Sequence, residues 1–155
     1  IMKRIAVFPG SFDPFTVGHQ NIVLRAMLMF DEIIVAIGEN SQKKYMLSLE
    51  KRKAIIADAF KGVEQVKVES YSGLTVDYCN AEEAKFILRG LRNSRDLDFE
   101  QPIAQMNKKL DDSIETVFLV NAPEFSAINS SIVREIYLNG GDVSDFLPNG
   151  IKLEE

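Results

Sequence analysis

The sequence has few of the residues on which several common catalytic and structural devices depend. Its 155 residues include one cysteine, Cys79, one histidine, His19, and no tryptophan. A single cysteine excludes an internal disulfide and a multi-cysteine metal site. The spacing of apolar residues around Cys79 places it on the inner side of a predicted helix, so we interpret it as a core residue rather than a nucleophile.

Net positive charge and long apolar runs are also lacking. Eighteen basic residues against 23 acidic ones give a net charge of −5, and the isoelectric point is near 5.0. Such a chain has no basic field to attract a polyanion, so we expect no nucleic-acid partner and disfavour a tRNA-handling role. No membrane span, secretory signal or lipidation motif is visible, which predicts a cytoplasmic protein that does not associate with membranes.

The length and composition predict one globular domain. Hydrophobic residues make up 46% of the chain and charged residues 26%, which is ordinary for a folded domain of this size. We place the domain at residues 2–155. Ile1 precedes Met2, the expected natural start, and is interpreted as a remnant of expression cloning.

Short apolar runs alternate with helical patterns along the chain. The predicted strands are Arg4–Phe8, Glu32–Ile37, Gln65–Glu69, Phe86–Arg89 and Thr116–Val120. The predicted helices are Gln20–Phe30, Leu49–Phe60, Leu74–Glu82, Arg95–Leu110 and Ser131–Leu138. Pro102 lies inside the fourth helix and should kink it or delay its start. The alternation predicts an α/β fold with a doubly wound, five-stranded parallel sheet of the dinucleotide-binding (Rossmann-like) type, whose ligands bind beyond the C-terminal ends of the strands.

The first strand ends in the segment Pro9–His19, which breaks into glycine and proline before a helix begins. Gly18 allows a ligand to approach the backbone closely, and His19 falls in the first turn of the helix. Free N–H groups and the positive end of the helix dipole favour bound anions there. With the hydroxyl of Ser11, this segment predicts a phosphate site with an imidazole directed into it.

Charged groups follow two further strands. Lys43 and Lys44 lie after the second strand, where they either bind phosphate or are solvated surface residues. Residues 89–92, Arg-Gly-Leu-Arg, follow the fourth strand. Their guanidinium groups suit bidentate contacts with phosphate oxygens, or they pair structurally with Asp96 or Asp98.

Polar residues follow the third and fifth strands. Leu74 and Thr75 come after the third strand and are candidates for a pocket wall. Ser130 and Ser131 lie at a helix start after the fifth strand, where they either hold a phosphate or ribose or simply cap the helix.

Five of these motifs, taken in order, carry a resemblance. They are Gly10-Ser-Phe-Asp-Pro14 with Gly18-His19, Lys43 in its Lys-Lys loop, Arg89-Gly-Leu-Arg92, an acidic-aromatic helix ending in Glu100, and Ser130-Ser131 followed by Arg134. From about Lys3 to Pro148 the chain resembles the bacterial phosphopantetheine adenylyltransferases, within the T/HxGH nucleotidyltransferase superfamily. Three positions depart from the family pattern: Phe99 replaces a tyrosine, Asn129 replaces the first serine of its motif, and Pro102 is unexpected in its helix.

The resemblance implies an enzyme that transfers the adenylyl group of ATP to 4′-phosphopantetheine, giving dephospho-coenzyme A and pyrophosphate in coenzyme A biosynthesis. It also implies a homo-oligomer, typically a hexamer, that is inhibited by coenzyme A. Mg²⁺ is the expected cofactor. Because no carboxylate cluster is visible and no metal ligand is assigned, the phosphates are expected to supply most of its ligands.

The resemblance also assigns roles by position. Catalytic roles fall to His19, Lys43 and Arg92. ATP binding falls to Ser11, Phe12, His19, Gly90, Leu91, Arg92, Glu100, Phe125, Ser126, Ala127, Ile128, Asn129, Ser130 and Ser131. Binding of phosphopantetheine falls to Ser11, Lys43, Thr75 and Arg89. Because the attacking phosphate is already anionic, we expect direct in-line attack without a general base or a covalent enzyme intermediate.

Two other functions are compatible with these motifs. Another member of the superfamily, such as a nicotinate mononucleotide adenylyltransferase or a glycerol-phosphate cytidylyltransferase, would share the Gly-His site and differ in its acceptor pocket. A non-catalytic nucleotide-binding module would keep the fold without turnover.

Overall fold

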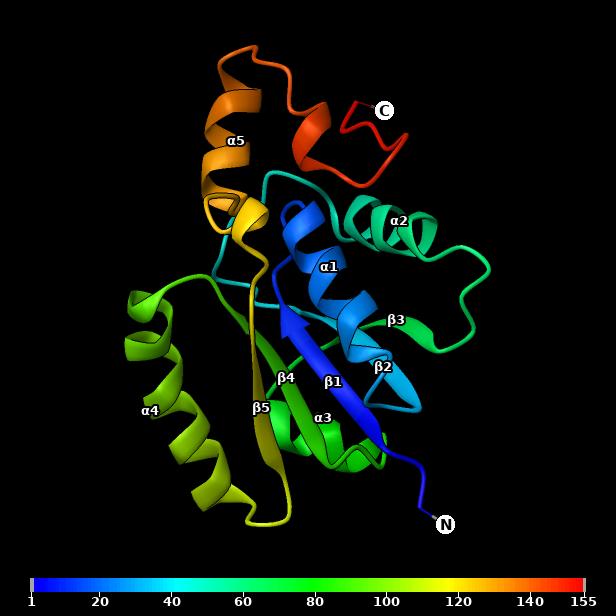
Figure 1. Cartoon of the computed structure of the whole chain (residues 1–155), viewed down its shortest axis with the longest axis vertical. Coiled ribbons are helices and arrows are strands. Elements are labelled where there is room, and N and C mark those ends of the chain that lie inside the picture. The colour runs from blue at the N-terminus through cyan, green and yellow to red at the C-terminus, as the bar shows by residue number, and fades with distance from the viewer. Residues whose placement is uncertain (1, 155) are drawn as a thin grey trace.

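A computed structural model describes residues 2–154, so Ile1 and Glu155 lie outside the described part. Strands and helices alternate along it (Figure 1). The strands are β1 (Ile5–Gly10), β2 (Glu32–Gly38), β3 (Val66–Tyr71), β4 (Phe86–Leu91) and β5 (Glu115–Val120). The helices are α1 (Val17–Ala26), α2 (Leu49–Ala59), α3 (Thr75–Ala81), α4 (Ser94–Leu110) and α5 (Ser130–Leu138), with short 3₁₀ turns at Pro123–Phe125 and Ser144–Phe146.

The five strands form one sheet in the order β3-β2-β1-β4-β5, and every neighbouring pair is parallel. The doubly wound parallel sheet predicted from the sequence is therefore confirmed. The chain builds outward from β1 through β2 to β3 and then returns to the other side of β1 with β4. This reversal leaves a crevice beyond the C-terminal ends of β1 and β4, which is where ligands bind in such sheets.

Both faces of the sheet are covered, because successive residues of each central strand point to opposite sides. Phe8 and Val35 belong to a large apolar cluster with residues of α1, α2 and α5. Val7 and Ile34 belong to a smaller cluster with residues of α3. Figure 1 shows the helices on the two sides of the strands. Cys79 is fully buried in the smaller cluster, and its burial raises the pKa of the thiol to about 12, so it is a core residue as expected.

Two helix boundaries differ from the sequence prediction in ways that matter for the site. Helix α1 begins at Val17 rather than Gln20, because Thr16 caps it. Helix α4 begins at Ser94 and runs through Pro102 to Leu110, so proline does not delay its start; Asn93 caps it by accepting the N–H of Asp96. Among residues 2–154, no helix is both long and apolar enough to cross a membrane.

Candidate active site

The loop after β1 fixes the orientation of the His19 ring. Thr16 caps α1, and its side-chain oxygen accepts the His19 N–H at 3.4 Å. In return, the Thr16 backbone N–H donates to Nδ1 of His19 at 3.0 Å. Because Nδ1 accepts a backbone proton, the neutral ring carries its own proton on Nε2.

Three phenylalanine rings surround this imidazole. The ring centroids of Phe8, Phe12 and Phe15 lie 6.2, 5.1 and 5.4 Å from that of His19. Burial, and then the charges of two nearby arginines, lower the pKa of His19 to about 3. At neutral pH the group is therefore an uncharged hydrogen-bond donor through Nε2, and it is a poor proton acceptor.

The loop after β2 carries Lys43 to the same place. Lys43 Nζ lies 3.0 Å from Ser11 Oγ. The loop is tied down by the buried carboxylate of Asp13, which accepts the backbone N–H groups of Met46 and Leu47 at 2.8 and 2.9 Å. The first two strand ends are thus joined through side chains.

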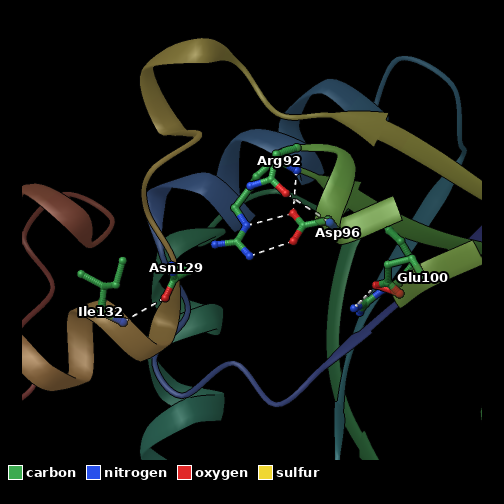
Figure 2. Close-up of polar contacts among 7 residues, drawn as sticks. Arg92, Asp96, Glu100, Asn129 and Ile132 are labelled. Atoms are coloured by element: carbon green, nitrogen blue, oxygen red, sulfur yellow. Dashed lines mark hydrogen bonds and ion pairs between the residues drawn. The ribbon is translucent and has the colours of Figure 1, made fainter. Parts of the chain in front are cut away.

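Arg89, near the end of β4, and Arg92, just after it, are both ion-paired, and Figure 2 shows the pair of Arg92 with Asp96. Arg89 donates through Nε to the buried Glu100 at 2.5 Å, and through Nη1 to the carbonyl of Pro9. Arg92 makes a bidentate pair with Asp96 at 3.0 and 2.9 Å. Burial opposes ionisation of Asp96, but the hydrogen bonds and charge of Arg92 outweigh it and lower the pKa of that carboxyl.

A cavity of about 360 Å³ opens at this point. Most of the residues singled out in the sequence line it: Ser11, Phe12, His19, Lys43, Arg89, Gly90, Arg92, Glu100, Ile128, Asn129, Ser130 and Ser131. Leu91, Phe125, Ser126 and Ala127 do not line it. The structure therefore brings four of the five strand ends together around one space, as the fold requires.

Thr75 lines a second cavity of about 280 Å³ beside the first. Its hydroxyl is 2.9 Å from that of Tyr71, which also lines this space. Leu74 is half exposed and does not line either cavity. Ser11 and Arg89 line both cavities and so stand at their junction.

At the start of α5, an asparagine caps the helix (Figure 2). Asn129 accepts the Ile132 N–H through Oδ1 at 2.9 Å. Ser130 instead donates through Oγ to the carbonyl of Pro14 at 2.9 Å. Asn129 therefore takes the capping role considered for Ser130 and Ser131. Asparagine caps helices as well as serine does, so residue 129 can be an asparagine where the family motif has a serine and α5 still begins at the same place.

Several residues that the sequence did not single out for the site also line the first cavity. Among them is Arg134, which donates to the carbonyl of Asp13 at 2.9 Å and to Ser131 at 3.2 Å. The sequence could have identified Arg134 as a lining residue, because it is one turn beyond Ser130 on the same helix face. Asn121 is another: a Cβ at Gly90 would lie 2.9 Å from its side-chain oxygen, so a larger residue at this position would require Asn121 to shift.

The acidic residues around the first cavity are not arranged to hold a metal ion. Residues 2–154 contain no group of three or more histidine, cysteine, aspartate or glutamate side chains suited to that purpose. The three lining carboxylates, Asp13, Asp96 and Glu100, are each engaged by backbone N–H groups or by an arginine.

Comparison with known proteins gives consistent matches over nearly the whole chain. A profile of the cytidylyltransferase-like family matches residues 7–136. A phosphopantetheine adenylyltransferase of Flavobacterium psychrophilum is 52% identical over 97% of this chain and 99% of that relative. One of Flavobacterium johnsoniae is 49% identical over 98% and 99%.

Solved structures match the fold. A bifunctional NMN adenylyltransferase/ADP ribose pyrophosphatase from Francisella tularensis has a TM-score of 0.74 and 18% identity, covering 97% of this chain. The structure of that protein complexed with AMP and a manganese ion has a TM-score of 0.70. This chain spans 46% of the length of each of those structures.

Proposed function

This chain belongs to the phosphopantetheine adenylyltransferases, within the cytidylyltransferase-like family, and we propose that the two adjoining cavities are its two substrate sites. The enzyme transfers the adenylyl group of ATP to 4′-phosphopantetheine, giving dephospho-coenzyme A and pyrophosphate. The observation that carries the site assignment is the convergence of His19 and Lys43 on a cavity that continues past Arg89 into a second one.

We assign ATP to the first cavity. The start of α5, with Ser130 and Ser131, presents backbone N–H groups and hydroxyls of the kind that hold phosphate. Arg92 lines the same space with its guanidinium fixed by Asp96, which supports a role in holding the pyrophosphate group. The buried carboxylate of Glu100 is paired with Arg89, so it contributes to this region by orienting that arginine.

We assign phosphopantetheine to the second cavity, with its phosphate at the junction. Ser11 and Arg89 line both cavities and offer a hydroxyl and a guanidinium there, and Lys43 of the first cavity brings its ammonium to 3.0 Å from Ser11 Oγ. The hydroxyl pair of Thr75 and Tyr71 supplies polar partners for the amide groups of the pantetheine arm. This division lets the acceptor phosphate meet the α-phosphate of ATP where the two cavities join.

The chemistry proposed is a direct in-line attack of the acceptor phosphate on the α-phosphate of ATP. The bond to the α-phosphorus forms from an already anionic oxygen, and the bond to the pyrophosphate oxygen breaks, so no proton needs to be removed. His19 donates through Nε2 to the developing charge, and Lys43 neutralises it. Orientation by the two cavities and this charge stabilisation are the sources of rate acceleration.

Mg²⁺ is proposed to enter with ATP, as a substrate-borne ion. The engaged state of the cavity carboxylates supports this assignment. Phosphate oxygens and water are suitable ligands for this hard cation. The cytoplasmic location expected from the sequence stays a prediction.

A hexameric assembly is the proposed quaternary structure. Helix α4 exposes Phe99, Ile103, Met106 and Leu110, which recur at the spacing of one helix face. An apolar face of this kind supports self-association. Coenzyme A is the proposed feedback inhibitor, because it shares its pantetheine and adenine parts with the two substrates and could span both cavities.

Pyrophosphate release measured with different acceptors tests the proposed function. Turnover is expected with ATP and 4′-phosphopantetheine, and not with nicotinate mononucleotide or with glycerol 3-phosphate and CTP. Higher turnover with nicotinate mononucleotide, or with glycerol 3-phosphate and CTP, would show that the chain has the activity of another branch of the superfamily. Tight ATP binding with no turnover on any acceptor would instead identify a non-catalytic module.

A further inference from the structure

Arg52, on α2, is a buried cation without a carboxylate partner among the described residues. The residue is 3% exposed. None of the ion pairs between residues 2 and 154 includes it. Removing a charge from water is costly unless other contacts compensate. The contacts that offset this cost therefore indicate what the guanidinium does.

These contacts join two of the loops that form the active site. Arg52 donates through Nη1 to the carbonyl of Ser11 at 2.9 Å and through Nε to the carbonyl of Leu47 at 3.2 Å. Its guanidinium carbon lies 4.0 Å from the centroid of the Tyr45 ring. One rigid, planar group thus holds the loop after β1, the loop after β2 and an aromatic ring at fixed spacing.

Lys43 lies within this arrangement. Its ammonium group is 3.0 Å from Ser11 Oγ and 5.5 Å from the centroid of the Tyr45 ring. Both of these neighbours contact Arg52. The lysine side chain itself is exposed and flexible, so its place depends on the backbone that carries it.

We propose that Arg52 is a positioning residue for Lys43. It fixes the loop after β2 against the loop after β1, so that the ammonium group stays beside Ser11 where the two cavities join. Arg52 lines neither cavity and so acts through Lys43 rather than on a substrate. The inference rests on the proposed role of Lys43 in binding and turnover.

A double-mutant cycle tests it. The variants are Arg52→Met, Lys43→Ala and the two combined, with kcat and the KM of each substrate measured by pyrophosphate release. Arg52→Met is expected to lower kcat/KM for phosphopantetheine about 10–100-fold, the scale for a small misplacement of a catalytic group. In the Lys43→Ala background the same change should have an effect within about twofold, because the residues act as one unit. Lys53→Met, which removes one charge from the same helix, is the matched control and should match the wild type.

Three results would overturn the inference. Additive losses would show that Arg52 acts independently of Lys43. Full activity in Arg52→Lys would show that its charge, and not its fixed fork of donors, is what matters. A silent Lys43→Ala variant would remove the proposed role of Lys43 itself, and is distinguished by that single mutant. If Arg52→Met does not fold, Tyr45→Leu takes its place in the cycle: coupling with Lys43→Ala supports the inference, and additivity refutes it.

Discussion

The unusual state of His19 makes a prediction about stability as a function of pH. The perturbation is His19→Asn, whose amide oxygen can accept the Thr16 N–H in place of Nδ1 but cannot titrate. In the wild type the folded-state pKa of His19 is about 3, against an ordinary value of 6.5. Between these values the unfolded chain binds a proton that the folded chain excludes. The contribution of His19 therefore destabilises the fold progressively as pH falls through this window.

The magnitude follows from the two pKa values. A pH of about 5 is about 1.5 units below the pKa of His19 in the unfolded chain. This difference corresponds to about 2 kcal/mol of lost stability. His19 lines the cavity, so solvent reduces this figure, and we expect about 1–2 kcal/mol. The variant lacks this contribution, while its other titrating groups are the same as in the wild type.

Urea unfolding followed by circular dichroism at about pH 7, 6 and 5 measures the effect. The free energy of unfolding of the wild type should fall more steeply toward acid than that of His19→Asn. Parallel curves would show that the ring is not held neutral, and the reasoning from burial would fail. The variant should also lose at least ~100-fold in turnover, because it lacks the Nε2 donor.

Three further outcomes are expected. Lys43→Ala should raise the KM for phosphopantetheine and lower turnover about 10–100-fold, while Lys44→Ala serves as the neighbouring control; an effect on the KM for ATP alone would move Lys43 to the nucleotide site. Glu100→Gln should lower the free energy of unfolding by about 1–3 kcal/mol in urea titrations, since Arg89 loses its counter-charge. It should also raise the KM for phosphopantetheine, whereas a change confined to the KM for ATP would support direct contact with the nucleotide. Chelation of Mg²⁺ should abolish turnover and leave the thermal midpoint of the ligand-free protein unchanged, and a lower midpoint would reveal a resident cation site.

The order of elements could be predicted because its signals are local and strong. Apolar runs such as Glu32–Ile37 predict strands that are covered on both faces. The boundaries of the predicted strands differ from those of the observed strands by one or two residues. The start of α1 could not be placed, because the Thr16 cap depends on the side chain of His19 three residues later. A residue considered as a ligand group was therefore also a helix-capping group, and the apolar periodicity did not show this.

The strand-end residues of the site were predictable for a topological reason, whereas their partners were not. A parallel sheet brings all its C-terminal ends to one edge, so Ser11, Lys43 and Arg89 were expected together. That Arg89 pairs with Glu100 depends on how α4 packs after β4, and no local pattern encodes that packing. The same holds for Arg52, whose two carbonyl partners lie 41 and 5 residues away in the chain.

An acidic chain is thus able to bind two anionic substrates, because the carboxylates at the site are paired while some of the basic side chains there are not. Four basic and three acidic side chains line the first cavity. Each acidic group there is turned to a backbone N–H or to an arginine, while Lys43 and Arg134 have no carboxylate partner among the described residues. The positive charge left open to phosphate is carried by these two side chains and by the N-termini of α1 and α5. The excess of acidic residues therefore lies outside the cavity lining, and salt largely screens exposed charges that are more than about 10 Å away from the site.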